Sequence, residues 1–341
     1  MNIFFHHSYN LDCLNLLNLL AGDIQLRETY PEVYAEFGQP LSLESREILV
    51  QVSSALGSTM ISPPVAFGLS VIPQFDKASL LDLLLDEQGF QAAITQNDPR
   101  LAMQQKQLFL LFQVLAPVIQ EIEFLGFREY WISEFLSDLD DRIDELDISI
   151  QQSGLTGNLH TLIPKGELPE EIHIYLCALA GKHAVRLTKH CSLVDISFGD
   201  RQILDFSLHE IIHAALPERI IEKSLQPLQT DSFVQLAFEK TRNLFPTNEI
   251  LSYLKENSIE AFKVHLLSIS GFLPDPFDYL LNLKNGAYVL AVILLDFLTW
   301  QPGGEKSMMS SLQDWMDTQP AGKLVQLYRH ALHRAGKAIG D

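Results

Sequence analysis

The hydrophobic pattern of the chain changes near residues 153–157, and this change limits the fold to one class. Before it, apolar residues recur at helical spacing, most clearly over residues 11–20 and 101–125. After it come three short stretches rich in β-forming residues, at 171–179, 184–187 and 193–198. Helical spacing returns from Asp205 and dominates to the end of the chain. The pattern predicts an α+β protein that is predominantly helical.

The chain of 341 residues is long enough for about two domains. Hydrophobic residues make up 47% and charged residues 20%, which suits a folded chain with a large core and not a disordered one. We therefore predict a helical domain at 1–155. At 156–341 we predict a second domain, in which a small sheet is followed by helices.

The charge balance excludes several classes of partner. Lysine and arginine number 24 and aspartate and glutamate number 43, so the net charge is −19. Binding to nucleic acid or to anionic lipid needs a basic face, and we predict neither. The three cysteines follow no pattern of a disulfide framework or of a cysteine zinc site.

The sequence shows no targeting signal of the common kinds. The first residues carry no lysine or arginine, and the apolar stretch after them is broken by polar residues. The longest strongly apolar run, at 287–295, is far shorter than the roughly 20 residues that span a bilayer. We predict a cytoplasmic protein without membrane insertion.

One motif carries chemistry. Residues 209–213 read His-Glu-Ile-Ile-His, which is H-E-x-x-H. On a helix the two histidines project from one face about 5–6 Å apart, so His209 and His213 can hold one Zn²⁺. Glu210 stands beside the first ligand, where it can take a proton from a water molecule on the metal.

A structural interpretation of the same residues competes with the catalytic one. Ser207 and Glu210 fit a capping box, in which Glu210 only closes the start of a helix. Asp205 fits the N-cap better, and it places the motif one turn inside an apolar helix that follows the β-type stretch 193–198. This context favours the metal interpretation.

Residues 171–300 resemble a zincin metallopeptidase of the gluzincin type, the group of thermolysin-like peptidases and related aminopeptidases. The resemblance depends on the stretch Leu-His-Glu-Ile-Ile-His-Ala at 208–214, preceded by strands and followed by helices. It implies a zinc-dependent peptidase with Glu210 as the catalytic acid and base. The metzincin signature is absent, since Arg219 stands where its third histidine belongs.

The resemblance also implies a third zinc ligand, because gluzincins supply a glutamate from the next helix. The stretch 228–235 occupies that place in this sequence, and Asp231 takes the ligand position. A helix N-cap without a metal role is an equally good interpretation of Asp231. Glu239 and Glu260 are the other candidates for the third ligand.

A tyrosine is the second candidate for a catalytic role. Zincins often bring a tyrosine or histidine from a C-terminal helix to hydrogen-bond the developing oxyanion. Tyr288 opens the predicted apolar helix at 287–298 and resembles such a residue, with a core tyrosine as the alternative. His265, His173 and His160 are further candidates for this role.

The sequence as a whole predicts a zinc-dependent metallopeptidase. Its partner is a peptide or protein substrate, which we expect to pair with an edge strand near 193–198. Two alternatives stay open: a catalytically inactive zincin-like binding or regulatory protein, and a helical interaction protein in which H-E-x-x-H arose by chance. The sequence leaves the oligomeric state open.

Overall fold

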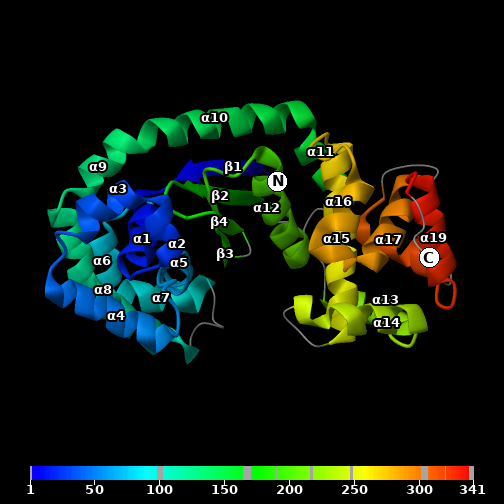
Figure 1. Cartoon of the computed structure of the whole chain (residues 1–341), viewed down its shortest axis with the longest axis horizontal. Helices are drawn as coiled ribbons and strands as arrows, with labels where there is room; N and C mark the ends of the chain where they lie inside the picture. The colour runs from blue at the N-terminus through cyan, green and yellow to red at the C-terminus, as the bar shows by residue number, and fades with distance from the viewer. Residues whose placement is uncertain are drawn as a thin grey trace. The chain divides into compact units, whose positions relative to one another are not determined.

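The computed structural model divides into two compact units, each built from segments far apart in the sequence (Figure 1). Unit 1 comprises residues 1–2, 149–170 and 200–341, and unit 2 comprises residues 3–148 and 171–199. The structure describes residues 2–97, 103–163, 170–188, 190–215, 218–245, 249–300, 306–318 and 320–337.

Unit 2 contains a mixed sheet with the strand order β1–β2–β4–β3. The strands are β1 (Asn2–His7), β2 (Glu171–Cys177), β3 (Ala184–Thr188) and β4 (Cys191–Asp195). β2 is parallel to β4, with Cys177 opposite Asp195, and β3 is antiparallel to β4. The N-terminal strand β1 thus joins a sheet whose other strands come from the middle of the chain.

Helices from the first part of the chain complete unit 2. They are α1 (Tyr9–Leu20), α2 (Ile24–Thr29), α3 (Pro31–Val33), the π-helix η1 (Tyr34–Gly38), α4 (Leu43–Leu56), α5 (Ser62–Leu69), α6 (Leu80–Leu85), α7 (Glu87–Asn97), α8 (Gln105–Phe124) and α9 (Phe127–Glu134). α10 (Leu136–Ser153) belongs to unit 2 over most of its length, and its last residues count with unit 1.

The leucine-rich helix α1 is buried along its whole length, including its polar residues. Ser8 caps its start by accepting a hydrogen bond from the amide of Leu11. Asp12, which is fully buried, accepts hydrogen bonds from the indole of Trp131 and from the amides of Ala178 and Leu179. One carboxylate therefore joins α1, α9 and the end of β2.

Unit 1 is helical, and α15 packs against α11, α12, α13, α14, α16 and α17. Its α-helices are α11 (Leu155–Leu162), α12 (Asp200–Ala215), α13 (Glu218–Leu225), α14 (Ser232–Thr241), α15 (Ile250–Ile269), α16 (Pro276–Asn282), α17 (Val289–Trp300), α18 (Met308–Asp317) and α19 (Leu324–Arg334). Short 3-10 segments are η3 (Gln226–Leu228), η4 (Arg242–Leu244) and η5 (Leu283–Gly286).

The predicted fold class is confirmed, since the protein is a predominantly helical α+β structure. The predicted domain ranges differ from the two units, because strands β2 to β4 group with the N-terminal helices and not with the motif helix. The expectation of an edge strand near 193–198 is wrong. β4 is hydrogen-bonded to β2 on one side and to β3 on the other, so its backbone groups already have partners.

One helix of the described chain, α8, is long and apolar enough to cross a membrane by length and composition. In its most apolar window 44% of the residues are buried inside the protein. Core helices of water-soluble proteins pass the same test, so this single helix is weak support for a membrane span.

The buried Asp12 predicts a pH-dependent stability. Burial raises its pKa to about 6, against the opposing effect of its hydrogen bonds, so the folded protein keeps a proton that the unfolded chain loses near pH 3.8. The free energy of unfolding is expected to fall by about 3 kcal/mol as the pH rises through this window. Urea titrations followed by tryptophan fluorescence measure this fall.

The control for this experiment is Asp12→Asn, which has no titrating group at the position. Its free energy of unfolding should lack the component that wild type loses between about pH 4 and 6. A difference between the two proteins that stays constant across this range would contradict the prediction.

Candidate metal centre

The H-E-x-x-H motif lies well inside helix α12, which begins at Asp200. The predicted helix start is therefore wrong: Asp205 is not the N-cap, and Ser207 is a buried residue within the helix. Helical spacing buries one apolar side of α12, made up of Ile203, Leu204, Leu208, Ile211, Ile212 and Ala215. His209 and His213 share another face, as their spacing predicts.

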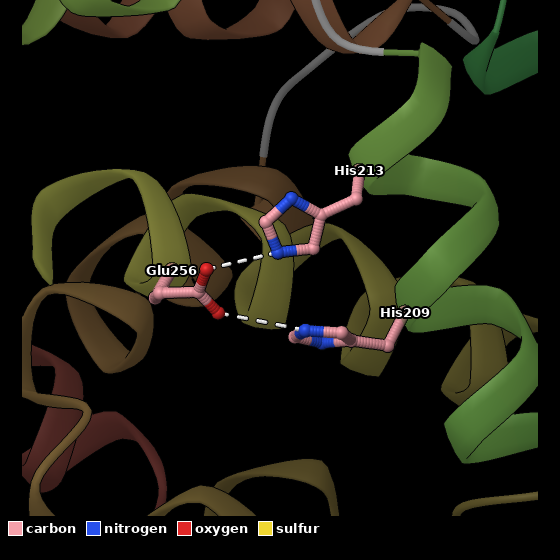
Figure 2. Close-up of side chains that lie close together, drawn as sticks. All are labelled: His209, His213 and Glu256. Atoms are coloured by element: carbon pink, nitrogen blue, oxygen red, sulfur yellow. Dashed lines mark ion pairs between the residues drawn. The ribbon is translucent and has the colours of Figure 1, made fainter. Parts of the chain in front are cut away.

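The structure brings Glu256 of α15 to the two histidines. Figure 2 shows both imidazole rings extending from α12 toward its carboxylate, with one oxygen facing each ring. Nε2 of His213 lies 2.9 Å from Oε1, and Nε2 of His209 lies 3.5 Å from Oε2. One ligand atom from each of the three residues lies within 4.8 Å of the others, which is close enough for a shared metal ion.

The three side chains are partly accessible and strongly coupled. Their exposed fractions are 22% for His209, 21% for His213 and 19% for Glu256. Burial opposes the charge of Glu256, but the hydrogen bonds and charges of the two histidines prevail and hold its pKa well below the usual range. Burial likewise disfavours charge on His209, yet hydrogen bonds to Glu256 and Glu260 raise its pKa to about 9.

A second group of charges lies on the same two helices. Oε2 of Glu260 lies 3.6 Å from Nδ1 of His209, on the opposite side of the ring from Nε2. Nζ of Lys263 lies 2.7 Å from Oε1 of Glu260 and 2.8 Å from Oδ1 of Asp205. The hydroxyl of Tyr279 donates to the same oxygen of Asp205 at 2.9 Å. The residues behind the imidazole are therefore held by ion pairs.

The structure corrects the prediction that Asp231 is the third ligand. One of its oxygens accepts from the amides of Phe233 and Val234 as the N-cap of α14, and the other accepts from the amide of Gly322. The N-cap alternative is the one that the structure bears out. Glu239 pairs with Arg242 on the surface instead, at 3.5 Å.

The true neighbour, Glu256, was missed because the gluzincin pattern directs attention to the helix next after the motif. In this chain α13, η3 and α14 intervene before α15. A signal was present in the sequence. Glu256, Glu260 and Lys263 lie at spacings of four and three on a helix otherwise rich in buried apolar residues, which places three charges on one face. Charges on the buried face of a helix require partners.

Tyr288 is placed next to α15 by hydrogen bonds. The hydroxyl of Tyr253 donates to the carbonyl of Ala287 at 3.0 Å, and the side chain of Asn257 accepts from the first backbone amides of α17. Tyr253 and Asn257 flank Glu256 on α15. The helix that supplies the carboxylate therefore also fixes the backbone on both sides of Tyr288.

The ring of Tyr288 is buried, with 3% of its surface exposed, and packs edge-on against Phe245. Burial, followed by the charges of Glu260 and Glu256, raises its pKa above the ordinary value. The catalytic role of Tyr288 stays a prediction.

The remaining candidates lie on several different elements. Glu210 follows His209 on α12 and is half-buried. His265 lies on α15, where burial lowers its pKa. His173 belongs to the sheet of unit 2 and shares a hydrogen bond with His6, and His160 lies on α11.

Comparison with known proteins identifies no relative: no family model, no curated protein and no solved structure matches the chain. The interpretation of the cluster therefore depends on its own residues and geometry.

Measuring the metal content of variants tests whether Glu256 or Asp231 is the third ligand. Wild type is expected to hold one divalent ion per chain, and Glu256→Ala to lose it because only two ligands remain. Asp231→Ala should keep the ion while unfolding more easily, by about 1 kcal/mol for the lost cap. Elemental analysis and thermal unfolding measure the two effects.

Glu239→Ala is the matched control, since it removes an exposed carboxylate elsewhere in unit 1. Loss of the ion from Asp231→Ala but not from Glu256→Ala would contradict the assignment of the third ligand.

Proposed function

We propose that this protein is a zinc-dependent hydrolase that cleaves peptide bonds. One observation carries the proposal: His209 and His213 on one face of α12 meet Glu256 of α15, and Glu210 stands beside the first histidine. Two imidazoles and a carboxylate are a ligand set that catalytic zinc sites use, with a further position left for water or substrate.

The surroundings of the three ligands also fit zinc. Each of the three side chains is partly exposed, so water can reach the site. Glu260 lies against Nδ1 of His209, which leaves Nε2 of that ring directed toward Glu256. Contacts of this kind orient metal-binding histidines and select the ring nitrogen that binds.

In this proposal Glu210 and Tyr288 have different roles in hydrolysis. A bound zinc ion supplies the Lewis acidity that activates a water molecule and polarises the substrate carbonyl. Glu210 takes the proton from the attacking water and passes it to the leaving amine. The hydroxyl of Tyr288 donates to the carbonyl oxygen as negative charge develops there.

A catalytically inactive zincin-like protein is a weaker candidate. That alternative depended on the lack of a clear third carboxylate in the sequence, and Glu256 supplies one. A chance H-E-x-x-H on a helical interaction protein is weaker still, because chance does not explain two glutamates of α15 that face the motif histidines.

The proposed substrate is a peptide or protein, and the proposed location is the cytoplasm. Cys13, Cys177 and Cys191 form no disulfide, which suits a reducing compartment. The net charge of −19 favours basic substrates through long-range attraction. Hydrolysis of a non-peptide amide uses the same residues, and a substrate screen separates the two.

Glu210→Gln tests the catalytic step. Glutamine keeps the shape of the side chain but cannot accept a proton, so kcat is expected to fall by roughly 10²- to 10⁴-fold while the zinc content stays at one per chain. Mass spectrometry of a peptide library after incubation measures cleavage. Glu239→Gln is the control and should cleave like wild type. A peptide-cleaving wild type with a fully active Glu210→Gln variant would overturn the assignment of Glu210.

Tyr288→Phe tests the oxyanion contact. Removing one hydrogen-bond donor to the transition state is expected to lower kcat by roughly 10²-fold, with a much smaller change in KM. Tyr328→Phe is a suitable control, because Tyr328 is a partly buried tyrosine of α19. Equal kcat values for wild type and Tyr288→Phe would leave Tyr288 as a core residue only.

A further inference from the structure

A buried lysine lies at the centre of the charges behind the metal ligands. The exposed fraction of the Lys263 side chain is 4%, and that of Glu260 is 2%. Nζ of Lys263 bridges Glu260 of its own helix and Asp205 of α12, at 2.7 and 2.8 Å. A charge buried to this degree is stable only with charged partners, so the three side chains depend on one another.

The ion pairs form a ladder between two helices. Asp205, His209 and His213 follow one another at spacings of four along α12. Along α15 their partners run in the opposite order, with Lys263 against Asp205, Glu260 against His209, and Glu256 against both histidines. The pair of Lys263 with Asp205 therefore lies one turn along α12 from His209, and Lys263 is the cation of that pair.

The Glu260 carboxylate has two oxygens with different neighbours. Oε1 faces Lys263 and Oε2 faces Nδ1 of His209. Holding one oxygen on the ammonium group fixes the direction of the other. Without Lys263, the buried carboxylate of Glu260 and the partly exposed carboxylate of Asp205 would lose the cation that bridges them, and repulsion would separate them.

We propose that Lys263 is a positioning residue of the metal centre: by bridging Asp205 and Glu260 it holds Glu260 against Nδ1 of His209 and so directs Nε2 of that ring to the metal. This inference rests on the proposed function, because it assigns a role toward the same zinc site. Lys263 itself contacts neither metal nor substrate.

The test compares the zinc affinity of three variants in the full-length protein by competition with a chelator. Lys263→Met removes the cation and keeps most of the side-chain volume, and its zinc dissociation constant is expected to rise roughly 10- to 100-fold. Asp205→Asn weakens the same bridge from α12 and should raise the constant by less. Lys306→Met removes an exposed lysine that pairs with Asp314, and it should match wild type.

A second readout follows the His209 ring directly. Side-chain ¹⁵N–¹H spectra of the zinc-free protein are expected to show a changed His209 signal in Lys263→Met and an unchanged one in Lys306→Met. A purely structural role would lower stability without changing this signal in a folded variant.

The outcomes separate this proposal from the proposed function. A folded Lys263→Met variant with wild-type zinc affinity overturns the role of Lys263 alone. If that variant does not fold, wild-type affinity in Asp205→Asn overturns it. If wild type binds no zinc, the proposed function fails, and the His209 signal in Lys263→Met decides whether Lys263 positions the ring.

Discussion

The packing of α12 against α15 depends on buried charges that must find partners. Glu260 and Lys263 lie almost completely inside unit 1, where an unpaired charge costs several kcal/mol. Sliding one helix along the other would separate Lys263 from Asp205, so their ion pair favours the observed register of the two helices. That register also brings His209 and His213 to Glu256, so the requirement for charge pairing positions the candidate metal ligands.

The same helix organises the side of the centre that faces α17. Tyr253 and Asn257 lie one turn apart on α15 and bond the backbone around Tyr288. Glu256 lies between them, so one rigid helix carries the carboxylate and fixes the position of the tyrosine. A change in the register of α15 would displace Glu256, the candidate third ligand, and the predicted oxyanion donor together, which ties the geometry of the site to the core of unit 1.

The sequence predicted local features well and long-range ones poorly. H-E-x-x-H was readable because the spacing of two histidines on one helix needs no tertiary information. The choice of Asp231 failed because a residue before a helix reads equally well as an N-cap, and only packing shows where Glu256 goes. The expected edge strand near 193–198 failed for a similar reason, since the pattern of one strand does not show that β4 lies between β2 and β3.

The charged side chains between α12 and α15 carry a net negative charge that bound protons or a cation can balance. Glu256, Glu260 and Asp205 contribute three negative charges, and Lys263 contributes one positive charge. A proton on His209 alone leaves the group negative, whereas a proton on each imidazole, or a divalent cation held by neutral imidazoles, makes it neutral. Burial penalises net charge, so the low-dielectric surroundings favour the divalent ion over a single proton. The second group of charges therefore contributes to the negative charge that protons or a divalent ion at the candidate centre would balance.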